Sequence, residues 1–434
     1  MNPIAQSLNK EIEELSPTTY ALLSNLGKRL FFPKGILSQS AEAKSLAKKY
    51  NATIGTAILN GRPMHLKATE KFFNLEAEDV YPYAPPAGRP ALRQSWKKKV
   101  ERENPSTQNK DFGLPIVTSA ITHGLSLVGE LFIDEGDVII SPNKLWGNYR
   151  LTYETRLGAK IETFELFNEQ DEFNVEALSA CMKEQAAKTG KLVIILNFPN
   201  NPTGYTPKEA EAEGIVAAIK AQAEAGTKIL TVSDDSYFGL FYEDSITESL
   251  FGRFIGLHEN LLPLKLDGAT KEYYAWGFRT GFITFGAPKG VDPKIFTALE
   301  EKTKGSIRGA ISNCCHTSQT VVEKVLADPD FPADAADKHN IMKSRALKVK
   351  EVLNQAPYQD ELKYYPFNSG YFLCLKFADL DVELLRMHLL EKYGVGTIAI
   401  GKTDLRIAFS CIEAADVPEL FELILAGVRD LRAA

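Results

Sequence analysis

The stretch "KLVIILNFPNNPTGYTPKEAEAEGIVAAIKAQAEAGTKILTVSDD" (191–235) decides the fold. Its two ends are short, nearly continuous apolar runs, and the segment between them reads as an amphipathic helix that Pro207 opens and Gly226 closes. Apolar strands joined by helical crossovers are typical of a mostly parallel sheet covered on both faces. The stretch therefore predicts one strand–helix–strand unit of such a sheet.

The same alternation of strands and helices continues on both sides, from about residue 118 onward. Further strands are expected at 137–141, 160–164, 261–267 and 281–286, and a further helix at 174–190. Beyond residue 340 the order changes to a long helix and then a mixed set of strands and helices, typical of a separate, smaller α/β layer. We therefore predict three parts: an N-terminal segment with part of the small domain (1–62), a large domain (63–315) and a C-terminal small domain (316–434).

Composition and charge disfavour several classes of protein. The 434 residues are 44% hydrophobic and 24% charged, as in ordinary globular proteins, and the formal net charge of -6 disfavours a nucleic-acid partner, which needs a concentrated basic face. Residues 1–20 lack the basic start and apolar core of a signal peptide, and the longest apolar runs fall far short of the roughly 20 residues that span a bilayer. We expect no nucleic acid and no membrane segment.

The cysteines and histidines indicate neither disulfides nor a metal site. The five cysteines are scattered, without the paired spacing of a disulfide framework or a zinc knuckle, and none of the six histidines is followed by another four residues later. We therefore expect a cytoplasmic location and no bound metal.

Three polar residues follow or end predicted strands of the large domain. Asn201 comes after the strand that begins at 191, Asp234 ends the next strand, and Lys271 follows the strand at 261–267. In an open parallel sheet, ligands collect at the carboxyl ends of the strands. We therefore expect these three side chains to meet in one site.

Lys271 has the surroundings of a reactive amine. Small residues precede it, aromatic residues follow it in "GATKEYYAWGFRTGF" (268–282), and such packing removes water from the ammonium and lowers its pKa. An amine of this kind forms Schiff bases, whereas the alternative is an ordinary surface lysine. Arg279 lies between glycines, where its guanidinium suits a phosphate or, alternatively, a structural salt bridge.

Two further runs carry polar groups to the same strand ends. "NFPNNPTGYTP" (197–207) predicts a rigid turn that presents the amide of Asn201, with a cis bond expected before Pro202. "SDDSYFGLFY" (233–242) carries Asp234 and Tyr237. A carboxylate at the buried end of a strand is costly unless it meets a cation, and a protonated ring nitrogen is such a cation.

Taken together, "NNPTG", "DDSY", the lysine with "GFRTG" eight residues on, and "RIAFS" near the carboxyl end resemble the pyridoxal-phosphate aminotransferases of class I/II, the aspartate aminotransferase superfamily. The resemblance covers essentially the whole chain. It implies fold type I, with a mostly parallel seven-stranded sheet covered by helices and a smaller α/β domain. It also implies pyridoxal 5'-phosphate as cofactor, transfer of an amino group between an L-amino acid and a 2-oxo acid by a ping-pong cycle, and a homodimer with shared active sites.

The resemblance assigns a role to each residue at the strand ends. Lys271 would bind the cofactor as a Schiff base and move the proton in catalysis, and Asp234 would pair with the ring nitrogen. Tyr237 and Asn201 would bond the phenolic oxygen of the cofactor, and Arg279 would bind its phosphate.

The phosphate site implied by the resemblance departs from the usual pattern. Ala120, Ile121 and Thr122 open the helix whose amino terminus would hold the phosphate, where relatives more often have Ser-Gly-Thr. Gly268 likewise replaces a common phosphate-binding serine. We therefore expect the phosphate to depend mainly on backbone amides, with Tyr83 reaching across the dimer interface from the other subunit.

The resemblance also implies contacts to the cofactor ring and to the substrate. Trp146 would stack on the ring, with Tyr149 as the alternative. Arg406 would bind the α-carboxylate of the substrate, and the backbone at Gly55 would close over it. Arg308 resembles the second arginine through which dicarboxylate-specific relatives bind aspartate, glutamate or 2-oxoglutarate, although "CCH" replaces the prolines usual after "SN" at 312–313.

Two other kinds of function stay open at this stage. A lyase or decarboxylase would use the same cofactor and break a different bond of the amino acid. A cofactor-sensing regulatory domain would be expected to carry a basic helix-turn-helix, and the first sixty or so residues show none.

Overall fold

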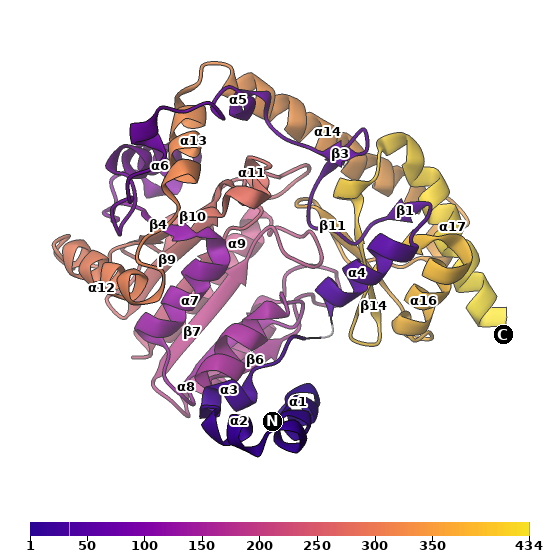
Figure 1. The fold of residues 1–434 in the computed structure, drawn as a ribbon, viewed down its shortest axis with the longest axis horizontal. Helices are drawn as coiled ribbons and strands as arrows, with labels where there is room; N and C mark the ends of the chain where they lie inside the picture. The colour runs from indigo at the N-terminus through magenta and orange to yellow at the C-terminus, as the bar shows by residue number, and fades with distance from the viewer. Residues whose placement is uncertain (34, 434) are drawn as a thin grey trace.

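A seven-stranded sheet forms the centre of the larger part of the molecule in the computed structural model, which describes residues 1–33 and 35–433 (Figure 1). In spatial order its strands are β4 (Ile116–Ser119), β10 (Thr280–Phe285), β9 (Leu261–Gly268), β8 (Lys228–Asp234), β7 (Lys191–Asn197), β5 (Val138–Pro142) and β6 (Lys160–Phe164). β10 runs antiparallel to both of its neighbours, and the remaining pairings in this sheet are parallel. The predicted fold class is confirmed, although β4 lies outside the predicted strand ranges.

The sheet is apolar on both faces because helices cover both of them. Along β7, Val193 and Ile195 belong to the apolar cluster that contains α7 (Ala120–Phe132), whereas Leu192, Ile194 and Leu196 belong to the cluster that contains α8 (Val175–Ala186) and α9 (Glu209–Glu224). Successive strand residues point to opposite faces, so a strand buried on both sides reads as a continuous apolar run. This burial explains the sequence pattern at 191–235.

The helix expected after Pro207 begins slightly later than the sequence suggests. Pro207 lies outside α9, and the backbone N–H of Lys208, the residue before the helix, donates to the Glu211 carboxylate at 2.6 Å. Gly226 follows the helix end with φ of 98°, a left-handed conformation that favours glycine. The amino terminus of α9 is therefore capped by the Glu211 side chain, and Pro207 is not part of the helix.

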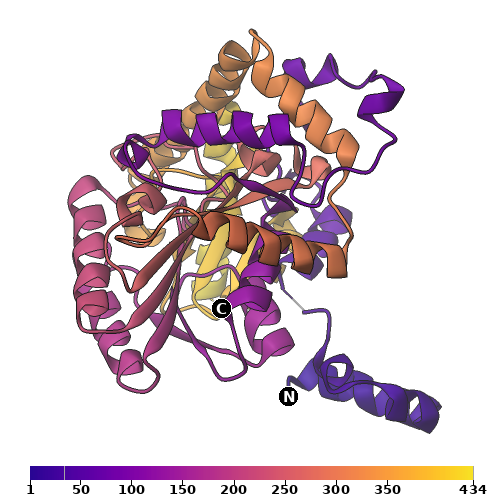
Figure 2. The same cartoon turned by 90° about the vertical axis from the view of Figure 1, so that its left-hand side faces the viewer.

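A second, smaller layer contains a three-stranded antiparallel sheet. Its strands are β11 (Phe372–Lys376), β14 (Asp404–Ala408) and β13 (Ile398–Ile400), and the long helices α14 (Phe331–Leu353), α16 (Val382–Tyr393) and α17 (Val417–Ala433) pack near it. The N-terminal segment joins this layer, since β1 (Tyr50–Asn51) pairs with β12 (Val395–Gly396). Helices α1 (Pro3–Leu15), α2 (Pro17–Leu22) and α3 (Asn25–Arg29) project from the body beside the large layer (Figure 2).

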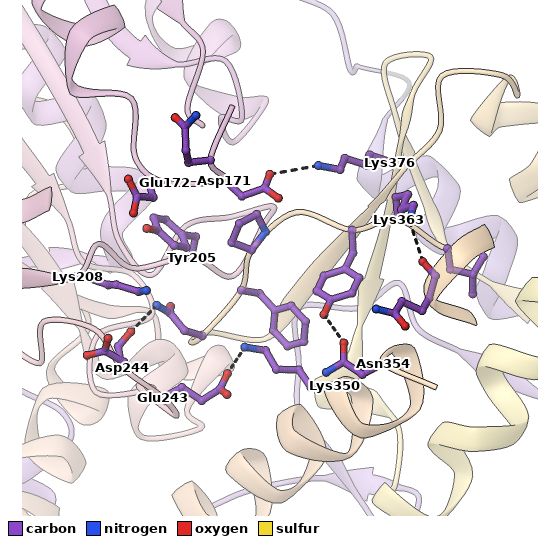
Figure 3. A pocket seen from close by; sticks show the side chains of 17 residues that line it. Asp171, Glu172, Tyr205, Lys208, Glu243, Asp244, Lys350, Asn354, Lys363 and Lys376 are labelled. Carbon is purple, nitrogen blue, oxygen red and sulfur yellow. Dashed lines mark hydrogen bonds and ion pairs between the residues drawn. The ribbon is translucent and has the colours of Figure 1, made fainter. Parts of the chain in front are cut away.

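A groove of about 640 Å³ lies where the two layers meet, away from the strand ends that carry Asp234 and Lys271. Ion pairs cross it from the small layer to loops of the large one: Lys376 to Asp171 at 3.3 Å, and Lys350 to Glu243 (Figure 3). These pairs hold the layers together at this seam.

The remaining elements are short strands and peripheral helices. They are α4 (Ile36–Leu46), β2 (Ile58–Leu59), β3 (Arg62–Pro63), α5 (Lys67–Glu70), η1 (Ala77–Asp79), α6 (Pro90–Glu103), η2 (Pro105–Thr107), the π-helix η3 (Arg150–Thr155), α10 (Leu250–Phe254), α11 (Ala269–Glu272), η4 (Trp276–Phe278), α12 (Ile295–Ala310), α13 (His316–Ala327), α15 (Tyr358–Glu361), η5 (Phe409–Cys411) and η6 (Ala414–Asp416). Within residues 1–33 and 35–433, none of the helices is both long and apolar enough to cross a membrane.

Gly281 on β10 lies directly against the first residues of α7. A Cβ at this position would come within 2.8 Å of the Ala120 carbonyl carbon and 3.0 Å of the Ile121 nitrogen, which are backbone atoms that cannot swing aside. We expect Gly281→Ala to lower the free energy of unfolding by about 1–3 kcal/mol through overpacking. The thermal unfolding midpoint measures this loss.

Gly305 in α12 provides the matched control. It is exposed, and a Cβ there would meet nothing within 4 Å. Gly305→Ala is expected to stabilise the protein by about 0.5–1 kcal/mol because alanine favours the helix. A Gly281→Ala protein as stable as the wild type would contradict the close contact between β10 and α7.

Candidate active site

A pocket of about 200 Å³ opens at the carboxyl ends of β7, β8 and β9, and most of the predicted site residues line it. The predicted residues found there are Gly55, Ala120, Ile121, Thr122, Trp146, Asn201, Asp234, Tyr237, Lys271, Arg279 and Arg406. Residues that are distant in sequence therefore meet in one place, as the strand-end argument predicts.

Lys271 enters the pocket from α11, which begins directly after β9. Its Nζ lies 5.0 Å from the centre of the Tyr237 ring, and the Tyr371 hydroxyl fixes its backbone by donating to the Lys271 carbonyl at 2.9 Å. Burial lowers the pKa of the Lys271 amine to about 8, with Asp234 opposing the shift and Arg279 adding to it. The amine is therefore much closer to neutral than an ordinary lysine.

Asp234 ends β8 and is 1% exposed. One carboxylate oxygen, Oδ2, accepts from the Tyr149 hydroxyl at 2.5 Å, and the other, Oδ1, accepts from the backbone N–H of Ser236 at 3.2 Å and from the Ser236 hydroxyl. Neutral donors thus hold this carboxylate beside the pocket. A buried carboxylate so held suits a cationic ligand group such as a protonated ring nitrogen.

The turn after β7 connects Asn201 with Asp234. Asn197 accepts from the Asn201 backbone N–H at 2.8 Å through its side-chain oxygen, and it donates to the Asp234 carbonyl at 2.9 Å through its amide nitrogen. The cis peptide bond in this turn is Phe198–Pro199, so the prediction of a cis bond before Pro202 is wrong. A chain of asparagines, not the proline at 202, fixes the turn.

Arg406 reaches the pocket from β14 of the small layer and is 2% exposed. Its guanidinium stacks 4.2 Å from the centre of the Phe372 ring and donates to the Asn201 side-chain oxygen at 3.1 Å and the Thr53 carbonyl at 3.0 Å. Its Nε has no partner among the described residues, and burial lowers the pKa of the guanidinium. A buried cation bonded only to neutral groups needs an anion, and a carboxylate matches its geometry.

The start of α7 and Arg279 form one end of the pocket. Backbone N–H groups at a helix start favour an anion, and Arg279 adds a charge there. Gly268 has no room for a side chain, because a Cβ would lie 2.7 Å from both the Gly281 Cα and the Thr280 carbonyl oxygen. The close packing of β9 and β10 therefore favours glycine at this position.

The two aromatic residues considered for ring stacking have different surroundings. Trp146 lines the pocket and meets the Tyr149 ring edge to face, with centroids 5.7 Å apart. Tyr149 is buried and its hydroxyl is engaged with Asp234. Tyr149 also lines the pocket, so the stacking role of Trp146, with Tyr149 as the alternative, stays a prediction.

Two predicted residues do not reach the pocket of their own chain. The Tyr83 side chain is 89% exposed, and Arg308 is exposed at the end of α12, where it donates to the Ser312 hydroxyl. Five other lining residues were not predicted: Ile36, Asn197, Ser236, Thr270 and Phe372. Asn197, Ser236 and Thr270 lie inside the recognised motifs, whereas Ile36 and Phe372 have no local signal.

Comparison with known proteins agrees with this geometry. The family described as aminotransferase class I and II matches residues 60–424. The chain belongs to that family. Among its relatives, a probable aspartate/prephenate aminotransferase of Aquifex aeolicus is 24% identical over 362 residues, covering 81% of this chain and 83% of the relative. A probable N-acetyl-LL-diaminopimelate aminotransferase of Bacillus subtilis is 25% identical over 373 residues, covering 83% and 86%.

Solved structures show the same fold. An aminotransferase from Anaerococcus prevotii superposes with a TM-score of 0.82 at 22% identity, covering 92% of this chain and 98% of that one. The kynurenine aminotransferase of Pyrococcus horikoshii gives a TM-score of 0.79 at 15% identity, covering 96% of this chain and 99% of that one.

The family match and the aminotransferase relatives together identify the enzyme as a transaminase of a family that uses pyridoxal phosphate, and the lyase or decarboxylase alternative is not favoured.

The lowered pKa of Lys271 predicts an unusual pH profile for its labelling. With the cofactor removed, reductive labelling of Lys271 by a small aldehyde should become faster by about tenfold per pH unit and level off above about 8. Peptide mass spectrometry measures the rate at each pH. A rate that keeps rising to pH 10, as expected for ordinary surface lysines, would show that the amine is not desolvated.

Proposed function

We propose that this pocket binds pyridoxal 5'-phosphate through Lys271 and transfers the amino group of an L-amino acid to a 2-oxo acid. The observation that carries the proposal is the buried Arg406 guanidinium, which among the described residues has only neutral hydrogen-bond partners and an unpaired Nε, at the edge of a pocket that also holds a lysine with a lowered pKa. An α-carboxylate would satisfy that guanidinium while the α-amino group lies toward Lys271.

The donors of the pocket fit this cofactor. The start of α7 and Arg279 suit its phosphate, Asp234 suits its ring nitrogen, and Trp146 suits its aromatic face. The Asn201 side-chain oxygen is turned to Arg406, so its NH₂ group is available, with the Tyr237 hydroxyl, for the phenolic oxygen. When bound, the cofactor supplies an aldehyde that condenses with amines and a ring that withdraws electrons from the substrate.

Three residues of the pocket would each contribute to the transfer of one proton. Once the substrate amine has displaced it from the cofactor, Lys271 Nζ would take the proton from the substrate α carbon and later give it up on the cofactor side, and a pKa of about 8 for the free amine suits both base and acid. Arg406 orients the substrate by its carboxylate, which fixes the direction of the Cα–H bond relative to Nζ. The Asp234 carboxylate holds positive charge on the ring side of the pocket.

We also propose a substrate with a second carboxylate, with aspartate as the first candidate. Support comes from the names of the aspartate/prephenate relatives and from Arg308. Among the described lining residues, the cationic side chains are Lys271, Arg279 and Arg406, and each has a role in the proposal. A second carboxylate therefore needs a cation from elsewhere, and Arg308 of a second subunit would supply it.

A symmetric homodimer follows from the same reasoning. Tyr83 is 89% exposed in one chain, and Thr122 at the start of α7 is exposed as well, as expected if the neighbouring subunit covers them. Within the proposed division into parts 1–62, 63–315 and 316–434, the pairing of β1 with β12 supports the assignment of part of segment 1–62 to the small domain. The five cysteines are all free, in keeping with the proposed cytoplasmic location.

Replacing the lysine tests the core of the proposal. Wild-type enzyme with L-aspartate and 2-oxoglutarate should show ping-pong kinetics and a cofactor absorption band that changes when the amino acid is added. Lys271→Ala should retain cofactor without a covalent bond and lose turnover by about 10³-fold. The matched control is Lys98→Ala, an exposed lysine on α6, which should keep wild-type turnover. Near-normal turnover of Lys271→Ala would refute the assignment.

Mixed subunits test both the shared site and Arg308. Arg308→Ala should raise the KM for L-aspartate by about tenfold or more and leave monocarboxylic amino acids nearly unaffected. Combining Arg308→Ala and Lys271→Ala subunits should restore about a quarter of wild-type aspartate activity, because half of randomly paired dimers are mixed and each has one complete site. No recovery on mixing would contradict an arginine donated by the partner.

A further inference from the structure

Tyr149 lines the pocket beside Trp146 and Asp234, but it is outside the set of residues to which the proposed function gives a role. It precedes the π-helix η3, and its side chain is 1% exposed. Its hydroxyl donates to Asp234 Oδ2 at 2.5 Å, so the aromatic residue considered for ring stacking is instead a hydrogen-bond donor. π-helical turns are rare and occur frequently at functional sites.

The local geometry turns two tyrosines inward from the same segment. Tyr149 and Tyr153 are four residues apart and both are buried, but their hydroxyls have different partners. The Tyr153 hydroxyl donates to the Leu125 carbonyl at 3.0 Å, a structural bond to α7, whereas Tyr149 donates to Asp234. The segment therefore supplies one bond to the scaffold and one to the site.

The Tyr149 hydroxyl can act here only as a donor. Burial and the neighbouring Asp234 carboxylate raise the pKa of Tyr149 well above its usual range, so it keeps its proton. Hydrogen bonds to ionised groups are about twice as strong as neutral ones. The bond also fixes the rotation of the carboxylate, because Ser236 holds the opposite oxygen.

We propose that Tyr149 is a positioning residue, whose hydroxyl aims the Asp234 carboxylate at the ring nitrogen of the cofactor and stabilises its negative charge. The inference rests on the proposed function, since it needs Asp234 to face that nitrogen. Tyr149 touches neither substrate nor cofactor in this role and acts only through Asp234. The competing explanation is that Tyr149 fills space beside Trp146, which its ring also does.

Removing the hydroxyl while keeping the ring separates these explanations. Tyr149→Phe should weaken cofactor binding to the apoprotein by about tenfold and lower kcat by a similar factor. The KM for the amino acid should change little because Arg406 is untouched. Equilibrium titration of the apoprotein with pyridoxal phosphate gives the dissociation constant independently of turnover.

Tyr153→Phe is the matched control, since it removes a buried hydroxyl from the same segment without touching Asp234. It should bind cofactor with wild-type affinity. Comparing the thermal unfolding midpoints of the two apoproteins shows whether any loss of affinity in Tyr149→Phe comes from unfolding. Equal losses of affinity in the two variants would overturn the inference.

A double-mutant cycle with Asp234→Asn completes the test. If Tyr149 acts through Asp234, the effect of Tyr149→Phe on cofactor affinity should largely disappear in the Asp234→Asn background. An undiminished effect there would mean that Tyr149 acts by packing, which overturns this inference and leaves the proposed function intact. Wild-type affinity and turnover in Asp234→Asn alone would instead overturn the role of Asp234, and the inference with it.

Discussion

The cost of burying a charge that forms no direct ion pair within the described part of the chain organises this site. Asp234 is 1% exposed and Arg406 is 2% exposed, and the hydrogen-bond partners of both are neutral groups of the chain. Neutral donors and acceptors compensate part of the lost hydration and leave each charge able to gain from an ionic ligand. The protein therefore holds a carboxylate for a cation and a guanidinium for an anion on two sides of one small pocket, and this arrangement favours a ligand with both signs of charge.

The residues next to Asp234 and Lys271 follow the opposite rule, because their charges are paired within the chain. Asp235 comes directly after Asp234 and forms a buried ion pair with Lys265, which also lies 3.4 Å from Asp267. Glu272 comes directly after Lys271 and pairs with Lys99 at 2.9 Å. Neighbouring residues thus have different surroundings. Asp235 and Glu272 form ion pairs within the chain, whereas Asp234 and Lys271 face the pocket. Asp235 directly follows β8, Lys265 and Asp267 lie on β9, and Glu272 ends α11, so these paired charges help to fix the backbone from which Asp234 and Lys271 project.

Sequence reasoning succeeded where a local pattern carries the information. The doubly buried strands have a readable apolar pattern, and the topology brings the residues at their ends together, which explains why Asn201, Asp234 and Lys271 line one pocket. It failed where the contact depends on distant segments. The hydroxyl of Tyr149 on Asp234 and the Phe372 ring under Arg406 are contacts between elements far apart in the chain. Tyr83 and Arg308 do not reach the pocket of their own chain, so no argument from one chain can place them in a site.

Arg406 also links the three parts of the chain. It lies on β14 of the small layer, donates to Thr53 in the N-terminal segment, and donates to Asn201 at a strand end of the large layer. A substrate carboxylate would compete with these neutral acceptors for the same N–H groups, so binding would redistribute the bonds that join the parts. The seam on the other side is held separately by the pairs of Lys376 with Asp171 and Lys350 with Glu243. Ion pairs thus join the two layers at the groove, whereas at the pocket Arg406 joins them together with Tyr371, whose hydroxyl donates to the Lys271 carbonyl.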